Sequence, residues 1–92
     1  MPQTATPSHR LLVVDDEPDL RTLYELTLLR EGYDVESAGS VEEAWALLRQ
    51  RGPGGYHLVI TDMRLPDGTG LDVLRRIDDA GRHEKAVVIT AY

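Results

Sequence analysis

Two apolar segments of strand length, each leading into aspartate, constrain this chain more than any other feature. Residues 11–14 are all Leu or Val and precede Asp15 and Asp16, and residues 58–61 precede Asp62. Branched aliphatic residues favour the pleated, buried environment of a sheet. Short continuous apolar runs are typical of strands buried on both faces. Because open α/β sheets bind ligands at the carboxyl ends of their strands, these aspartates are candidate site residues.

The segment after Asp62 predicts a tight turn. Pro66 fixes φ, the Asp67 side chain can bond its own backbone, and Gly68 tolerates positive φ. Asp62 is therefore expected at the end of a central strand. Two alternatives stay open for the aspartates themselves. Asp62 could begin an Asp-containing turn, and Asp15-Asp16 could merely cap the following helix, since Asp is a favoured N-cap residue.

Strand-like and helix-like segments alternate along the chain. The sequence predicts strands over 10–14, 34–38, 58–61 and 86–90, and helices over 17–31, 41–48 and 71–77. Asp16 is a candidate cap of the first helix, Gly32 a candidate residue just past its end, and Ser40 with Glu43 forms a capping-box pattern. This β-α-β-α-β-α-β order predicts right-handed βαβ units and a parallel sheet.

Each predicted helix carries an apolar stripe that we expect to face the sheet. The inward residues would be Leu20, Leu23, Tyr24, Thr27 and Leu28, widened by Leu26 and Leu29, in the first helix; Val41, Ala44, Trp45 and Leu48 in the second; and Leu71, Leu74 and Ile77 in the third. Trp45 is expected in the core rather than in a ligand stack. Residues 49–56 and 78–85 are predicted to be polar loops.

Composition limits the chain to one domain and excludes several classes of function. The 92 residues carry a net charge of −6 and no cysteine, so disulfides and thiolate metal sites are excluded. We expect a flexible tail over 1–9 and a single domain over 10–92. No apolar run approaches the ~18 residues of a membrane span, and residues 1–9 contain no secretory signal. The acidic balance argues against nucleic-acid binding by this segment, and three scattered histidines argue against a histidine metal site.

Polar side chains end three of the predicted parallel strands. Asp15 and Asp16, Asp62 and Thr90 would meet at one edge of the sheet if these strands are neighbours. Clustered carboxylates repel one another and favour a bound cation. With only oxygen ligands the cation would be Mg²⁺, then Mn²⁺ or Ca²⁺. A carboxylate beside such a metal can attack a phosphoryl group and become an aspartyl phosphate, with the Thr90 hydroxyl bonding a phosphoryl oxygen. Thr90 could also be an ordinary strand residue.

At these residues the sequence resembles the receiver domain of two-component response regulators. The resemblance covers Leu11 to Tyr92, and its motifs are Leu-Leu-Val-Val-Asp-Asp-Glu-Pro at 11–18, Ile-Thr-Asp-Met-Arg-Leu-Pro-Asp-Gly-Thr-Gly at 60–70 and Val-Val-Ile-Thr-Ala at 87–91. It implies a flavodoxin-like (CheY-like) doubly wound parallel sheet in the order 2-1-3-4. The segments 63–66 and 90–92 look most like receivers of NtrC-type, sigma-54-dependent activators, including a pilus-regulator-like kind.

The resemblance also implies a role for each candidate site residue. Asp62 would be the phosphoacceptor for a histidine kinase. Asp16 would bind Mg²⁺ directly, and Asp15 directly or through water. The main-chain carbonyl of Arg64 would be a further metal ligand, and Thr90 would be the switch hydroxyl.

The sequence departs from the receiver pattern after the fourth strand. Receivers carry a fifth βα unit, with a Lys that pairs with the phosphoryl group; Lys85 precedes the fourth strand and does not match it. We therefore expect a segment of a longer protein, incomplete at its C-terminus and lacking its output domain. The fourth strand would be an apolar edge around Val87, Val88 and Ile89, which favours pairing with a second copy.

The sequence thus predicts a cytoplasmic signalling domain that accepts phosphate on Asp62 and switches an attached, transcription-regulating module. It would not be a turnover enzyme, because its substrate is itself. One alternative is an interaction fragment that takes no phosphate. Another is a phosphatase of the haloacid dehalogenase kind, which would need a second Asp where Arg64 stands.

Overall fold

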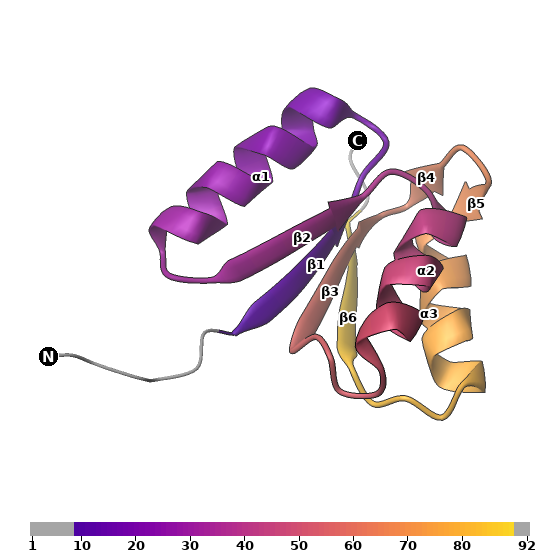
Figure 1. Cartoon of the computed structure of the whole chain (residues 1–92). Helices are drawn as coiled ribbons and strands as arrows, with labels where there is room; N and C mark the ends of the chain where they lie inside the picture. Colours follow the sequence, from indigo (N-terminus) through magenta and orange to yellow (C-terminus); the bar gives the residue numbers. More distant parts are fainter. Residues whose placement is uncertain (1–8, 90–92) are drawn as a thin grey trace, which may run out of the picture.

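The computed structural model describes residues 9–89, and its main elements follow the predicted alternation (Figure 1). Along the chain these are β1 (Arg10–Val14), α1 (Pro18–Arg30), β2 (Asp34–Ala38), α2 (Val41–Arg51), β3 (Leu58–Asp62), β4 (Arg64–Leu65), β5 (Gly68–Thr69), α3 (Gly70–Asp79) and β6 (Lys85–Ile89). The predicted tail over 1–9 lies, apart from His9, outside the described residues. The switch residue Thr90 lies outside them as well.

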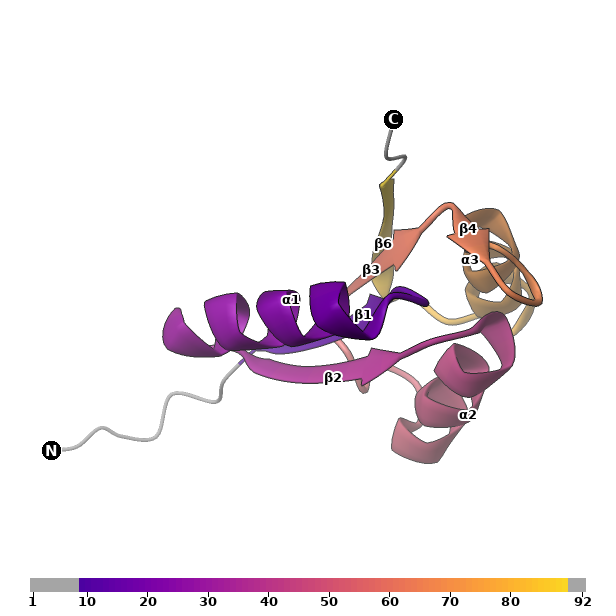
Figure 2. The same cartoon turned by 90° about the horizontal axis from the view of Figure 1, so that it is seen from above.

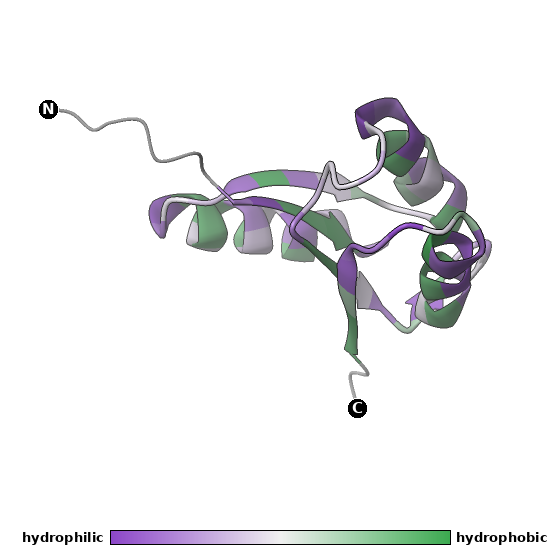
Figure 3. Ribbon diagram, turned by 90° about the horizontal axis from the view of Figure 1, so that it is seen from below, coloured by the Kyte–Doolittle hydropathy of each residue, from purple (hydrophilic) through white to green (hydrophobic). Residues whose placement is uncertain are grey.

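Four parallel strands form the main sheet in the order β2-β1-β3-β6. β1 pairs with β2 on one side and with β3 on the other, and β3 pairs in turn with β6. The strands at the centre of the sheet are apolar along most of their length (Figure 3). β1 is buried on both faces, as predicted, whereas β3 is buried on one face and half-buried on the other, where Leu58 and Ile60 lie. The predicted parallel sheet and its order 2-1-3-4 are confirmed. The sequence did not predict the short antiparallel pair β4-β5, which flanks the turn at Pro66 and Asp67.

The three helices divide between the two faces of the sheet. α1 lies on one face, and α2 and α3 lie together on the other (Figures 1 and 2). The main core forms under α2 and α3 from the residues Leu12, Val14, Ala38, Val41, Ala44, Leu48, Tyr56, Val59, Leu65, Val73 and Ile77. Trp45 packs against this core, as expected.

The predicted inward stripe of α1 is largely wrong. No residue of α1 is fully buried, and Leu23, Leu26 and Leu29 are 58%, 59% and 62% exposed. α1 contacts mainly β1 and β2, so within residues 9–89 only one side of the helix is covered. The leucines of α1 lie on all sides of the helix, so the spacing of its apolar residues does not identify the covered side.

The helix ends agree with the sequence in part. Gly32 adopts φ 94° directly after the C-cap of α1, as predicted. The Ser40 side chain caps α2, accepting from the Glu43 amide at 3.0 Å, but the Glu43 carboxylate accepts from Gly39 instead of closing the box. A full capping box, not predicted, joins Thr69 and Asp72 at the start of α3.

One inward residue of the third helix was predicted wrongly, and the loop after this helix has an unpredicted feature. Leu71, expected to face the core, is 48% exposed, and Val73 is buried in the core instead. The predicted polar loop before β6 holds a buried ion pair between Arg82 and Glu84, whose side chains are 5% and 0% exposed. Arg82 also donates to the carbonyl oxygens of Leu48, at 2.7 Å, and Gly52, at 2.5 Å, which ties the end of α2 to the start of β6.

Candidate functional site

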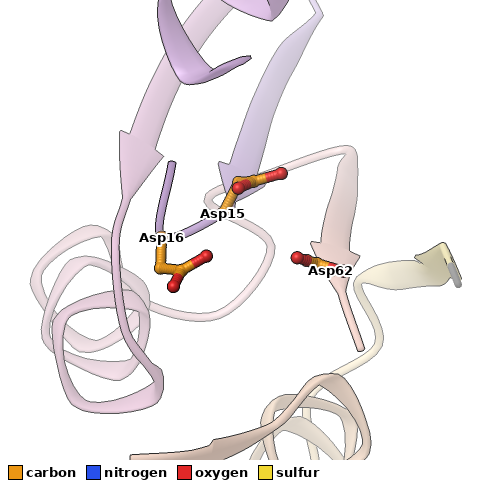
Figure 4. A group of neighbouring side chains, drawn as sticks. All are labelled: Asp15, Asp16 and Asp62. Carbon is orange, nitrogen blue, oxygen red and sulfur yellow. The ribbon is translucent and has the colours of Figure 1, made fainter. Parts of the chain in front are cut away.

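Three aspartates meet at the carboxyl edge of the sheet, where β1 and β3 end side by side. Asp15 and Asp16 follow β1, and Asp62 is the last residue of β3. One carboxylate oxygen from each lies within 4.8 Å of the others. Figure 4 shows the Asp62 side chain directed toward the other two. The structure therefore brings together the three acidic side chains that the sequence singled out.

Backbone contacts fix Asp15 on the β1 side of the site. Its amide donates to the Ala38 carbonyl at 3.0 Å, and its Oδ1 accepts from the Glu17 amide at 2.9 Å. Arg21 of α1 donates to the Asp15 carbonyl oxygen at 2.9 Å. The N-cap of α1 is Glu17, without a side-chain cap, so the alternative in which Asp16 caps this helix is wrong.

Asp16 and Asp62 leave their carboxylates available. Asp16 is exposed, Asp62 is half-buried and Asp15 is only 6% exposed. Within residues 9–89, neither the Asp16 nor the Asp62 side chain has a hydrogen bond or an ion pair with another residue. Since close carboxylates repel one another, this arrangement is suited to a cation.

The loop after Asp62 is held at both ends. The Met63 amide donates to the Ile89 carbonyl at 3.1 Å, and the Gly70 amide donates to the Met63 carbonyl at 2.9 Å. The buried Thr61 hydroxyl donates to the Asp62 carbonyl oxygen at 3.0 Å. Gly70 approaches β3 closely, because a Cβ there would lie 2.5 Å from the Asp62 carbonyl oxygen. Arg64 lies in this loop, in β4.

Asp67 has a contact that the sequence did not predict. Its two carboxylate oxygens accept from the amides of Val41, at 2.8 Å, and Glu42, at 3.0 Å, which begin α2. These hydrogen bonds hold the pKa of Asp67 below its usual range, and the one from the Glu42 amide has the larger effect. The sequence indicated only a turn here, because the position of α2 beside that turn depends on the tertiary fold.

Two of the three histidines also meet, although the sequence suggested that they are scattered. The ring centroids of His9 and His57 lie 4.6 Å apart. The His57 Nδ1 accepts from the Arg10 amide at 2.9 Å, so this nitrogen is occupied by the backbone at the start of β1.

An open parallel sheet with a cluster of carboxylates at its carboxyl edge defines a class of α/β domains suited to bind a hard cation there. The chain matches the response regulator receiver domain family over residues 11–92. It belongs to that family, and the predicted resemblance is confirmed.

Relatives and solved structures agree with this assignment. Response regulator protein PilR of Pseudomonas aeruginosa is 48% identical over 83 residues, which are 90% of this chain and 18% of PilR. Transcriptional regulatory protein TrcR of Mycobacterium tuberculosis is 39% identical over 89% of this chain and 31% of TrcR. The match to PilR agrees with the predicted NtrC-type, pilus-regulator-like resemblance. The chain spans less than a third of either relative.

Among solved structures, the response regulator TrrA of Thermotoga maritima in complex with Mg²⁺-BeF is 39% identical with a TM-score of 0.79, and the chain covers 70% of it. The non-phosphorylated HemR receiver domain of Leptospira biflexa is 32% identical with a TM-score of 0.82 and is covered to 65%. These alignments each include 91% of this chain. In the part of the chain that the structure describes, no helix has the length and apolar character needed to cross a membrane.

Proposed function

We propose that this domain accepts a phosphoryl group from a histidine kinase on Asp62, with Mg²⁺ bound beside it. The observation that carries the proposal is the convergence of three carboxylates within 4.8 Å at the ends of β1 and β3. The donors are all oxygens, which suits Mg²⁺, with Mn²⁺ as a substitute. The Mg²⁺-BeF complex of the similar TrrA supports this choice of metal.

The metal-binding roles divide among two residues that follow β1, the last residue of β3 and one residue of β4. Asp16 and Asp62 would bind Mg²⁺ directly, Asp15 directly or through water, and Arg64 through its main-chain carbonyl oxygen. The hydrogen bond from the Glu17 amide orients the Asp15 carboxylate at 2.9 Å. When bound, the metal would stabilise the negative charge on the transferred phosphoryl group.

Asp62 supplies the nucleophile. One carboxylate oxygen attacks phosphorus, the bond from phosphorus to the kinase histidine nitrogen breaks, and that nitrogen keeps the electron pair. The product is an acyl phosphate on Asp62 and a free histidine on the kinase. The Thr61 hydroxyl donates to the Asp62 backbone carbonyl at 3.0 Å, which restrains the strand end while the side chain reacts. Thr90 would then act as the switch hydroxyl.

The same proposal covers the cellular role. The domain would work in the cytoplasm as a self-phosphorylating switch rather than a turnover enzyme, and would control a transcription-regulating output domain that this segment does not contain. Its regulator relatives PilR and TrcR support that role. Arg64, two residues after Asp62, argues against a dehalogenase-like phosphatase, which needs an acid there.

Intact mass tests the proposal. We expect incubation with Mg²⁺ and a small-molecule phosphodonor to add the mass of one phosphoryl group, and Asp62→Asn or chelation of the metal to remove that adduct. Asp78→Asn, a change to an exposed carboxylate on α3, is the matched control and should leave the adduct in place. A folded chain that gains no adduct would favour the non-phosphorylated interaction fragment. Release of free phosphate over many cycles would favour the phosphatase.

We also infer that this 92-residue segment, on its own, can pair with a second copy along β6 and form a homodimer. Among the described residues β6 pairs only with β3, and its Val87 and Ile89 side chains are 48% and 40% exposed. Such an edge can pair with another chain. Sedimentation should show a concentration-dependent dimer that Val87→Lys weakens. A stable monomer at all concentrations would contradict this prediction.

A further inference from the structure

The turn between β4 and β5 is joined to a helix that is distant in sequence. The Asp67 carboxylate accepts from the Val41 amide at 2.8 Å and from the Glu42 amide at 3.0 Å, one oxygen for each. Amides at the start of a helix have no partner within the helix, and the positive end of the helix dipole favours a carboxylate. The contact therefore holds the tip of the turn against the first turn of α2.

Local capping of α2 does not require this contact. The helix has its own N-cap in Ser40, whose Oγ accepts from the Glu43 amide at 3.0 Å. Glu43 in turn accepts from the Gly39 amide at 2.6 Å. Asp67 adds a connection between two parts of the fold rather than a missing cap.

The loop that Asp67 holds, residues 63–69, directly follows β3. Asp62, the last residue of β3, precedes this loop, and Arg64 lies within it. The base of the loop is closed by the hydrogen bond from the Gly70 amide to the Met63 carbonyl at 2.9 Å. Asp67 fastens the tip, so that the backbone carrying Arg64 is fixed between two anchored points.

We propose that Asp67 is a positioning residue for the metal site: it clamps the loop 63–69 to α2 and so holds the Arg64 carbonyl and Asp62 in place for Mg²⁺. This inference rests on the proposed function. Mg²⁺ binding and the contact of Asp67 with α2 are then coupled, and each stabilises the other by the same free energy. Mg²⁺ binding will therefore slow hydrogen exchange at the Val41 and Glu42 amides.

The first experiment compares Asp67→Ala with Ser40→Ala in the absence of metal. Both changes remove hydrogen bonds from the start of α2, but only Asp67→Ala releases the loop. We expect exchange at the Gly70 amide to accelerate about tenfold in Asp67→Ala, in line with an opening local structure, and to stay at the parent rate in Ser40→Ala. Equal exchange rates at Gly70 in the parent and in Asp67→Ala would overturn the clamp.

The second experiment titrates each protein with Mg²⁺ alone, followed by amide chemical shifts. Removing groups that orient metal ligands weakens binding by roughly 10- to 100-fold, and we expect Asp67→Ala to lie at the lower end of that range. Asp67→Asn keeps one acceptor oxygen and should restore part of the affinity, whereas Ser40→Ala should match the parent. Equal weakening in Ser40→Ala and Asp67→Ala would show a merely structural role. A parent that binds no Mg²⁺ contradicts the proposed function, while the exchange rates still decide whether the clamp exists.

Discussion

Replacing Arg82 by Ala should destabilise the domain by about 3 to 5 kcal/mol, because it leaves a buried carboxylate without its partner. The Glu84 side chain has no exposed surface, and its Oε1 and Oε2 accept from the Arg82 Nε at 3.0 and 3.1 Å. The change also removes the donor to the Leu48 carbonyl at the end of α2. Urea unfolding followed by Trp45 fluorescence measures the effect.

Two further variants distinguish the cost of leaving a buried charge unpaired from the cost of losing an ion pair in general. Arg75→Ala breaks the Arg75–Asp72 pair, whose side chains are 66% and 37% exposed, and should change stability by less than about 1 kcal/mol. The double variant Arg82→Met with Glu84→Leu removes both charges and should recover much of the loss. If Arg75→Ala and Arg82→Ala prove equally mild, the buried pair does not have the predicted importance.

The stability difference between the parent and Arg82→Ala should depend on pH. Burial alone would raise the pKa of Glu84, but the hydrogen bonds and the positive charge of Arg82, together with backbone hydrogen bonds that include one from the Gly54 amide, hold the pKa below the usual 4.5. In the parent, this interaction is present above pH 4.5 and is lost as the pH falls through the folded-state value. Without Arg82, burial raises the pKa, so the variant gains relative stability on acidification. The difference in unfolding free energy between parent and variant should therefore narrow as the pH falls, from the raised pKa of Glu84 in the variant down to its lowered pKa in the parent.

Gly70→Ala should damage the site more than the fold. The added Cβ would lie 2.5 Å from the Asp62 carbonyl oxygen, 3.0 Å from Thr61 Cγ2 and 3.1 Å from Val88 Cγ1. The first of these is backbone, so the end of β3 must move. Overpacking of this kind costs about 1 to 3 kcal/mol, and small displacements of reacting groups can reduce a rate about 100-fold. We expect Mg²⁺-dependent phosphorylation to fall at least tenfold.

Gly32→Ala is the control for this prediction. Gly32 has open space around it, since an added Cβ would meet no atom within 4 Å, but its φ of +94° strains any other residue. It precedes β2 and so lies at the amino edge of the sheet, opposite the aspartates. The substitution should lower stability by about 1 kcal/mol and leave phosphorylation at the parent rate. Matched losses of phosphorylation in the two variants would mean that stability alone explains the Gly70 effect.

The strands and the acidic site were predictable because their signals are local. The continuous apolar runs at 11–14 and 58–61 are typical of central strands, and each run ends at the last residue of its strand or one residue before it. Parallel βαβ topology then places Asp15, Asp16 and Asp62 at one edge. No helix packing had to be known for this step.

The remaining features depend on neighbours that the local sequence does not specify. Arg82 and Glu84 stand before a strand, where charged residues usually face solvent. Their burial depends on the carbonyl oxygens of Leu48 and Gly52 at the end of α2, which accept from Arg82. Asp67 resembles any turn residue until α2 is placed beside it. In α1 leucines occur on every side of the helix, so their spacing could not identify the buried side, and the predicted inward stripe included the exposed Leu23.

The central position of β1 determines when the acidic site can form during synthesis of the chain. Arg10 pairs with Asp34, and Leu11 pairs with Leu58, so no strand pairing in this sheet joins segments that are close in sequence. Contacts between distant segments form slowly, since the chain between them must first be ordered. Asp16 leaves the ribosome well before Asp62, and the two meet only when β3 docks beside β1. A nascent chain therefore has no complete cluster of carboxylates, and the proposed metal site forms only together with the finished sheet.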